Sequence, residues 1–520
     1  MPKTPSSKLF HLVKSLSSAE KRYFKIFINS KESASSKYAQ LFDAIDAQAA
    51  FDDEALRQSV YGDEPVETRK YSELKAYLYD LVLKSLQAYD EKSSVDYKLK
   101  NMLLGVRTLF KRSHFEDCKE LLGKAKKVAA LYEDFNTLIE ILAWEKMVAY
   151  AQMDIAFLDK KLSSIEAEEA DYLLQLKNIS SYKSIFFKIL VSIRKDVSRS
   201  EKQKSELSNL MQEPLLGNIQ LAQTYTAKVL FYRIHSIYNF SVSQFEEFYQ
   251  TSKKLLALME ENPLFLAEDV SEYISALNNH MVSCGRVDRL DEFMLTLNKL
   301  KKINPITVDD ALKIHRQYYQ GKFRYCINAG EFEEGIKELK EHLQDSKKFD
   351  LHLFQKSDFY FQYFCIYFGN NDFEKALDSL NEWMQLTDNV ERKDLQALAR
   401  ILNLIVHFEL GNTILLDSLI RSTYRYLNKE NRLFEFERKA IEFIREASRS
   451  QSKKEMRQLY ENLKQDFEQL SHSPAFGVFQ LFDIIAWLDS KISGKSFAAI
   501  VKQKFQESLK PKNDTSDSNM

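Results

Sequence analysis

The sequence predicts an all-α protein, and three observations lead to this prediction. A short motif returns about every 40 residues: a small or turn-forming residue, an apolar anchor two positions later, and a small or apolar residue three positions after the anchor. The anchors are Phe115, Ile155, Phe245, Val287, Phe332, Phe373 and, loosely, Thr413. Glycine and proline number only 12 and 8 among 520 residues, far below average usage. Hydrophobic residues make up 44% of the chain, which is ample material for a helical core.

Residues 1–92 are expected to form a helical N-terminal region. Ser17 and Glu20 have the spacing of a capping box, which predicts a helix that continues to Asn29. Further helices are expected over residues 37–48, 53–61 and 66–91.

Residues 93–508 are expected to hold eight or nine helical hairpins and a closing helical cap. Neighbouring anchors lie 40 to 45 residues apart, a period typical of stacked repeats. The longer gap between Ile155 and Phe245 leaves room for one weak hairpin near Val197. Pro263 and Pro305 each follow an Asn, and a helix is expected to end there because the residue before proline avoids the α region. We expect the hairpins to stack as a right-handed α-solenoid.

The physical chemistry of the motif fits a corner between two helices. Gly or Asn after a helix can take the left-handed conformation that closes its last turn. The acid that follows the anchor lies in the first turn of the next helix, where the helix dipole favours negative charge. The clearest copies are 371–380, 330–339 and 113–122.

This motif resembles the second half of the tetratricopeptide repeat, best over Phe332–Leu339 and Phe373–Leu380. The resemblance covers about residues 95–470 and implies stacked helical hairpins. The period exceeds the 34 residues of that family, and Tyr360 and Phe364 replace its first-helix Trp and Gly. The segment Leu16–Lys25 (LSSAEKRYFK) is also similar to the start of an uncharacterised bacterial helical-repeat family, a similarity that carries no activity with it.

Charge and cysteine usage favour a cytoplasmic protein with no membrane segment. The net charge is −1, which shows no bias of the whole chain toward nucleic acid or membrane. Cys118, Cys284, Cys326 and Cys365 lie singly, without a CxxC pair, and are expected to be reduced. The N-terminus lacks the features of a signal peptide. The polar tail, 509–520, is expected to be disordered.

No catalytic, cofactor-binding or metal-binding residues are predicted, so the protein is not expected to be an enzyme. The nine histidines include no pair three or four residues apart, and His407 is expected to be packed or solvated. Gly494-Lys495-Ser496 matches only the end of a P-loop, because Asp489 stands where that motif needs its first glycine.

Aromatic residues crowd two expected helices, and two interpretations remain open. The clusters are Phe359, Tyr360, Phe361, Tyr363, Phe364, Tyr367 and Phe368, and Tyr318, Tyr319, Phe323 and Tyr325. They are expected to pack between helices. The alternative is a concave groove lined by rings, because aromatic residues are enriched at binding surfaces.

The expected function is a non-catalytic scaffold that binds a protein or peptide along the repeat surface, placed at about residues 218–428. The alternative is a DNA-binding regulator whose helix-turn-helix lies at 53–61 and 71–86. Residues 41–92 carry twelve acidic and six basic residues, which disfavours DNA because affinity depends on neutralising phosphates. If the N-terminal region binds an acidic partner, the predicted contact residues are Lys14, Lys21, Arg22 and Lys25.

Overall fold

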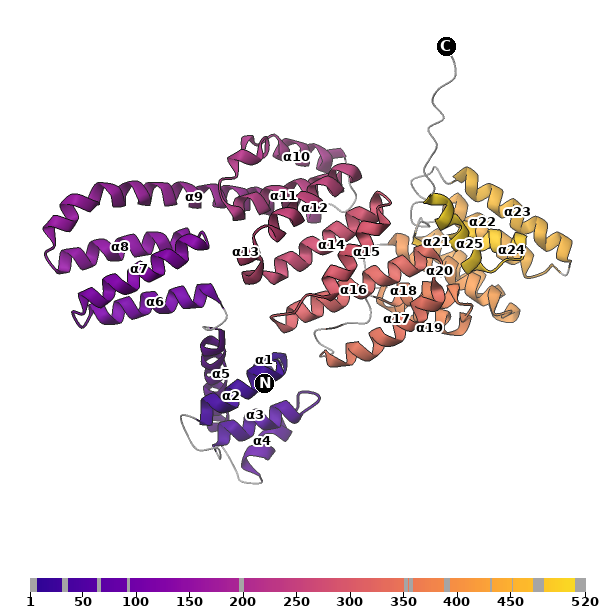
Figure 1. Cartoon of the computed structure of the whole chain (residues 1–520). Coiled ribbons are helices and arrows are strands. Elements are labelled where there is room, and N and C mark those ends of the chain that lie inside the picture. Colours follow the sequence, from indigo (N-terminus) through magenta and orange to yellow (C-terminus); the bar gives the residue numbers. More distant parts are fainter. Residues whose placement is uncertain are drawn as a thin grey trace, which may run out of the picture. The chain divides into compact units, whose positions relative to one another are not determined.

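The described part of the chain is helical throughout. The computed structural model describes residues 7–29, 36–62, 67–90, 94–195, 201–349, 354, 359–387, 393–430, 433–450, 452–470 and 481–509. These residues form 25 α-helices and three short 3-10 helices, and they include no strand (Figure 1). The all-α prediction is confirmed for this part of the chain. Two expectations, the weak hairpin near Val197 and the tail beyond Leu509, fall outside the described residues.

None of the described helices has the length and apolar character needed to cross a membrane. The chain divides into two compact units, Met1–Lys313 and Ile314–Met520.

The first unit begins with five helices that share one core. They are α1 (Lys8–Ser15), α2 (Ser18–Asn29), α3 (Lys37–Ala47), α4 (Asp53–Tyr61) and α5 (Thr68–Asp90). The predicted capping box is present: the Ser17 N–H donates to Glu20 Oε2 at 2.6 Å, and the Glu20 N–H donates to Ser17 Oγ at 3.2 Å. Phe24 and Phe42 meet in the core, with ring centroids 4.3 Å apart. All four helices predicted in this region are present, and α1 is an addition.

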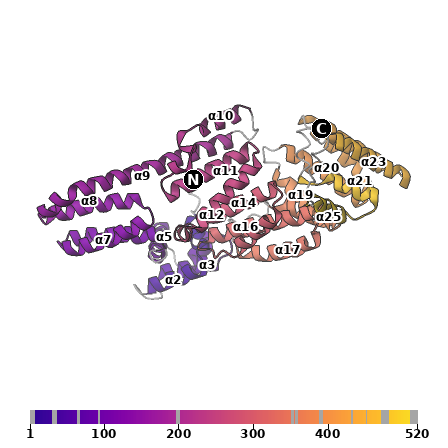
Figure 2. The ribbon, with the colours of Figure 1, turned by 45° about the horizontal axis from the view of Figure 1, so that its top comes forward.

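The rest of the first unit is a series of helices in which chain neighbours pack together. Its elements are α6 (Val95–Phe110), α7 (Phe115–Leu131), α8 (Phe135–Ala151), α9 (Ile155–Lys195), α10 (Glu201–Met211), η1 (Pro214–Leu216), η2 (Ile219–Leu221), α11 (Tyr225–Ser241), α12 (Phe245–Glu260), α13 (Pro263–Glu268), α14 (Val270–Arg286) and α15 (Leu290–Lys301). Helices α7, α8 and the start of α9 run side by side in both views (Figures 1 and 2). Helix α9 continues without a break for 41 residues.

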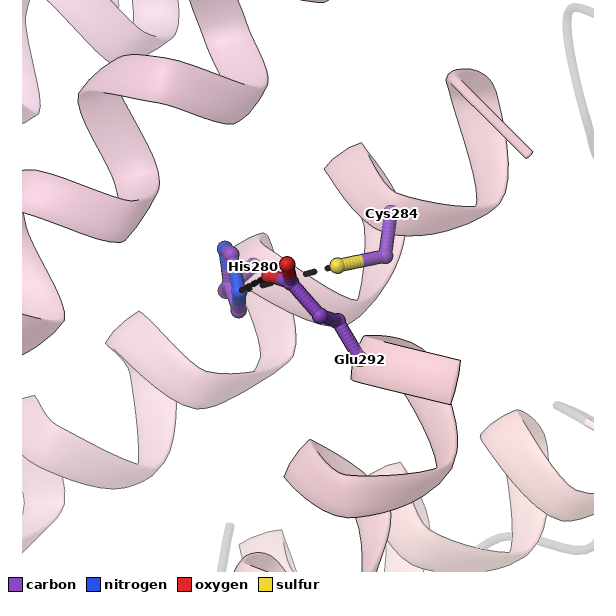
Figure 3. A group of neighbouring side chains, drawn as sticks. All are labelled: His280, Cys284 and Glu292. Atoms are coloured by element: carbon purple, nitrogen blue, oxygen red, sulfur yellow. Dashed lines mark hydrogen bonds and ion pairs between the residues drawn. The ribbon is translucent and has the colours of Figure 1, made fainter. Parts of the chain in front are cut away.

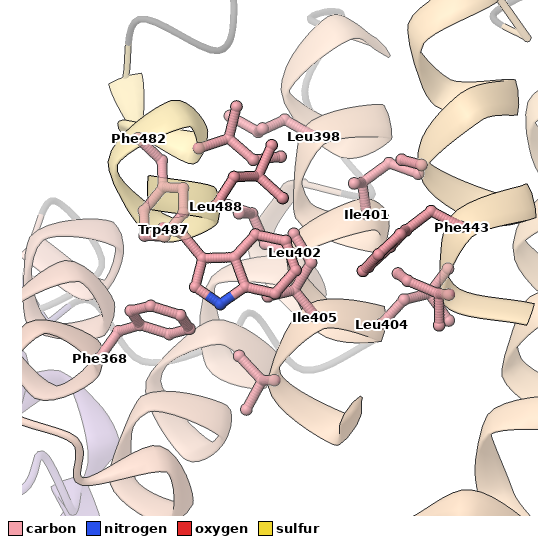
Figure 4. Packing of buried hydrophobic residues seen from close by; sticks show 14 of the residues in the cluster. Phe368, Leu398, Ile401, Leu402, Leu404, Ile405, Phe443, Phe482, Trp487 and Leu488 are labelled. Atoms are coloured by element: carbon pink, nitrogen blue, oxygen red, sulfur yellow. The ribbon is translucent and has the colours of Figure 1, made fainter. Parts of the chain in front are cut away.

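Helix α16 (Val308–Ala329) contains the boundary between the units, and nine further α-helices follow it. They are α17 (Phe332–Asp345), α18 (Tyr360–Gly369), α19 (Phe373–Thr387), α20 (Lys393–Glu409), α21 (Thr413–Lys429), α22 (Glu435–Ala447), α23 (Lys453–Leu470), α24 (Ile484–Ser493) and α25 (Phe497–Ser508), with η3 (Ser346–Lys348) after α17. Side chains of α20 fill the core together with Trp487 of α24 (Figure 4).

The second unit is closed by α25, which returns to the corner before α17. Lys502 Nζ lies 2.8 Å from Glu331 Oε1. A Cβ on Gly330 would lie 2.7 Å from the Lys502 backbone nitrogen, so only glycine allows this close approach. The rings of Phe332 and Phe497 meet at 5.6 Å.

Eight corners between consecutive helices share one backbone geometry. In each, the residue two positions before the new helix has a positive φ; these residues are Ser113, Glu133, Met153, Ser243, Asp288, Gly330, Asn371 and Gly411. The N–H of the following residue donates to the carbonyl five positions earlier, at 2.9 to 3.1 Å, as in a Schellman motif. The carbonyl of that same residue accepts the first hydrogen bond of the next helix. One residue therefore ends one helix and starts the next.

Six of the seven predicted anchors begin a helix: Phe115, Ile155, Phe245, Phe332, Phe373 and Thr413. The prediction for Val287 is wrong. Gly285 continues α14 instead of ending it, and the positive φ lies at Asp288, so that Leu290 begins the next helix. Both predicted proline stops are found, since Pro263 opens α13 and Pro305 follows the end of α15.

Candidate functional site

Three of the four predicted N-terminal contact residues turn toward helix α3. Lys21 Nζ lies 2.7 Å from Asp46 Oδ1, and Lys25 Nζ lies 2.8 Å from Asp43 Oδ1. The Lys14 ammonium donates to the Asp46 carbonyl at 2.8 Å. These contacts partly neutralise the positive charge that the sequence placed here.

The fourth residue, Arg22, is exposed and forms no ion pair with a described residue. In the helix pair considered for DNA binding, Lys75 of α5 is 2.8 Å from Asp53 of α4. Among the described residues of this region, Lys21, Lys25 and Lys75 thus have acidic partners, which disfavours their use in neutralising phosphates.

The aromatic clusters are interior. Phe359, Phe364 and Phe323 are fully buried, and no ring of either cluster is exposed. The packing interpretation is therefore confirmed for these rings. Phe368 also lines a pocket of about 280 Å³, but because no ring is exposed, the aromatic argument for a binding surface at residues 218–428 is lost.

Exposed apolar side chains are found on helix α9 instead. Leu162, Leu173, Phe187 and Val191 are 40–60% exposed. At about 100° per residue, they fall within roughly 40° of one another around the helix axis. The opposite face of α9 is buried against α11 and carries Ile179, Tyr182, Ile185, Phe186 and Ile189. The helix therefore has a second, interrupted apolar stripe: Phe187 and Val191 are one turn apart, whereas Leu173 and Leu162 lie 14 and 25 residues before Phe187, with Glu169 and Ser180 on the same line.

The exposed stripe opens into a groove between α9 and α10. The groove has a volume of about 770 Å³. Its lining residues are Ser184, Phe187, Lys188, Val191 and Ser192 on α9 and Glu206, Asn209 and Leu210 on α10. Phe187 and Val191 are thus shared by the stripe and the groove.

Positive charge flanks the part of the stripe after Asp171. No Asp or Glu occurs from Tyr172 to Lys195. Lys177, Lys183 and Lys188 are exposed, and none of them forms an ion pair with a described residue. Lys183 lies on one side of the stripe and the other two lie on the opposite side, about 60–80° from its centre.

A second candidate site lies where α14 and α15 meet. His280 and Cys284 are one turn apart on α14, and Glu292 reaches them from the first turn of α15 (Figure 3). His280 Nε2 is 3.6 Å from Cys284 Sγ and 3.7 Å from Glu292 Oε2. Nitrogen, sulfur and oxygen ligand atoms thus lie within 4.8 Å of one another.

The surroundings of this cluster set its electrostatics. Burial lowers the pKa of His280 and raises the pKa of Cys284 to about 12. A hydrogen bond from the Tyr249 hydroxyl holds the pKa of Glu292 below its usual range. The histidine is therefore neutral, the thiol protonated and the carboxylate charged at neutral pH.

Nucleophilic catalysis does not fit this arrangement. Cys284 is fully buried and its thiolate is disfavoured, whereas a reactive cysteine is accessible and has a lowered pKa. Sequence reasoning missed the cluster because it considered only His–His and CxxC pairs. The signal was present as a His and a Cys four residues apart on one helix face.

The remaining sequence candidates have structural roles. Gly494 takes the left-handed conformation that ends α24, and Ser496 caps α25. His407 is buried, and its Nδ1 lies 3.2 Å from Asn412 Nδ2. All four cysteines are free, buried thiols.

The chain matches no protein-family model and no curated protein.

Proposed function

We propose that this protein is a non-catalytic scaffold that binds a partner protein through helix α9. The observation that carries the proposal is the exposed stripe of Leu162, Leu173, Phe187 and Val191. Single exposed apolar residues are common, but Phe187 and Val191 are adjacent and line the groove between α9 and α10, which favours an interaction site. We call this stripe and its flanking lysines the α9 surface.

The chemistry of the α9 surface selects the kind of partner. An apolar stripe beside a groove accepts the apolar face of an amphipathic helix. The three exposed lysines favour acidic residues at the edges of that face, because complementary charge increases the association rate and specificity. The partner segment is therefore an amphipathic helix with an apolar face and acidic flanks.

The scaffold itself is proposed to be a right-handed α-solenoid of tetratricopeptide-like hairpins. The support is the recurring corner, in which a single residue joins consecutive helices and returns the chain along its neighbour. Repeats of this kind present long surfaces. The proposal moves the partner surface from residues 218–428 to α9, and it keeps the assignment of a non-catalytic protein in the cytoplasm.

Two fluorescent peptides test the proposal on the full chain. They share the same leucine face and differ only in carrying Glu or Lys beside it. Fluorescence anisotropy should show binding of the Glu peptide that weakens with added salt, and at least about tenfold weaker binding of the Lys peptide. Equal affinity for both peptides would contradict the proposal that the lysines of the α9 surface select acidic residues on the partner.

Variants then locate the binding site. The double change Phe187→Ser and Val191→Ser should weaken binding of the Glu peptide by about ten- to a hundredfold, because each buried apolar side chain contributes about 1.5–3 kcal/mol and burial here is partial. Ile414→Ser is the matched control, since Ile414 is 96% exposed on α21. An unchanged affinity in the double variant would exclude α9 as the site.

A further inference from the structure

We propose that His280, Cys284 and Glu292 bind one divalent transition-metal ion, with Zn²⁺ as the best match. This site is separate from the α9 surface and goes beyond the proposed scaffold function. The set combines an imidazole nitrogen, a thiolate sulfur and a carboxylate oxygen, which are the three ligand types that zinc uses in proteins.

The distances between the ligand atoms suit a tetrahedral ion. With Zn–N and Zn–O bonds of about 2.0 Å and a Zn–S bond of about 2.3 Å, tetrahedral angles require an N···S separation of about 3.5 Å and an N···O separation of about 3.3 Å. The observed separations from His280 Nε2 are 3.6 Å to Cys284 Sγ and 3.7 Å to Glu292 Oε2. The third separation, between Cys284 Sγ and the Glu292 oxygen, is within 4.8 Å, whereas a tetrahedral ion needs about 3.5 Å, so the carboxylate has to move toward the sulfur by up to about 1 Å.

The histidine has a hydrogen-bond partner on its far ring nitrogen. His280 Nδ1 lies 2.9 Å from Ser252 Oγ, which also contacts the Tyr249 carbonyl at 2.9 Å and Ser283 Oγ at 2.8 Å. In the tautomer that a metal selects, Nδ1 donates to Ser252 and the lone pair on Nε2 faces Cys284 and Glu292. A hydrogen bond from the far ring nitrogen is the usual support of a metal-binding histidine.

The carboxylate is oriented in the same way. Glu292 Oε1 accepts hydrogen bonds from the Tyr249 hydroxyl at 2.7 Å and from Lys253 Nζ at 2.9 Å. These two contacts leave Oε2 directed at the imidazole. Both non-sulfur ligands are therefore positioned by neighbours that do not themselves bind the ion.

Binding is balanced in protons and charge. The ion forms a bond to Cys284 Sγ and displaces the thiol proton, which passes to solvent. The Glu292 side chain is 33% exposed, so it offers the ion a route from solvent and leaves a fourth position for water. The nitrogen and sulfur ligands disfavour Mg²⁺ and Ca²⁺, which prefer oxygen.

Cobalt provides a direct test on the full chain after treatment with a chelator. One equivalent of Co²⁺ should give a thiolate-to-cobalt charge-transfer band and the intense visible bands of a four-coordinate site, and one equivalent of Zn²⁺ should remove both. Cys284→Ala should abolish the charge-transfer band. Cys118→Ala is the matched control, because it removes another buried thiol and should leave the spectrum unchanged.

Glu292→Gln is a second variant that does not disturb a fully buried position. It should weaken cobalt binding at least tenfold while the helical circular dichroism stays the same. The proposal is overturned if the unaltered chain shows no charge-transfer band with one equivalent of Co²⁺. It is equally overturned if Glu292→Gln binds Co²⁺ as tightly as the unaltered chain.

Discussion

Helix α20 in the second unit and helix α9 in the first both carry apolar residues on more than one face. In α20, Leu398, Leu402 and Ile405 are buried, as are Ile401 and Leu404 between them, because α19, α21 and α22 cover the helix (Figure 4). In α9, the faces toward α8 and α11 are covered, and Phe187 and Val191 remain exposed. A helix that is apolar all round belongs in a core, so an uncovered second face indicates a missing partner. The comparison separates residues that stabilise the fold from residues that are available for binding.

The largest expected effect comes from truncating one leucine on each helix. Leu402→Ala should lower the free energy of unfolding by about 2–5 kcal/mol, because it leaves a cavity in a closed core. Leu173→Ala on α9 should change it by less than about 0.5 kcal/mol. Urea unfolding of the second unit can be followed by Trp487 fluorescence in a protein with Trp144 and Trp383 changed to Phe. Unfolding of the first unit is followed by Trp144 in a separate protein with Trp383 and Trp487 changed to Phe. Similar losses for both variants would contradict the comparison.

The stability of the second unit at low pH provides a second test. His315 is buried beside the rings of His342 and Phe354, and burial lowers its pKa to about 4. Its unfolded pKa is about 6.5, so the unfolded chain takes up the proton first as the pH falls. The second unit should therefore lose up to about 3 kcal/mol of stability between pH 6.5 and pH 4.

The measurement is the urea midpoint of the Trp487 transition at several pH values. His315→Phe removes the titrating group and should flatten the pH dependence. If the slope is the same in both proteins, His315 is not its source.

The smallest expected effect lies at the corner that opens α9. Met153 has a φ of 53° and is 71% exposed, so its side chain adds little packing while its backbone is strained. Met153→Gly should stabilise the first unit by about 1 kcal/mol, because a left-handed conformation costs a side-chain-bearing residue about 1–2 kcal/mol. Unfolding followed by Trp144 fluorescence gives the value.

Gly330 is the contrasting corner. Gly330→Ala should destabilise the second unit, because the new Cβ would meet the Lys502 backbone nitrogen at 2.7 Å. If Met153→Gly also lowers the stability, backbone strain at the positive-φ residue is not what determines the stability of these corners.

Local features were predictable from the sequence. The capping box at Ser17, the proline stops and six of the seven anchors depend on residues within a few positions of one another. The unbroken α9 was also within reach, because residues 155–195 contain no Gly or Pro. The corner at Glu133 was not, since glutamate has no preference for the left-handed conformation that it adopts here.

Features that depend on packing were not predictable. Whether a ring such as Phe364 points inward depends on helices from distant parts of the sequence. The approach of Glu292 to His280 depends on the turn at Asp288, which the sequence analysis placed three residues too early. Unpaired lysines on α9 could be identified only after every described acidic partner had been located.

The return of α25 to the corner at Gly330 has a consequence for synthesis on the ribosome. Phe332 leaves the ribosome about 165 residues before Phe497, the ring that covers it. At roughly 5–20 residues per second, that interval lasts on the order of ten to thirty seconds. The corners from α6 to α9 close within one or two helices and can form as they emerge. In the second unit, the apolar corner at Phe332 instead stays exposed until α25 is synthesised, and during this period a chaperone could bind it.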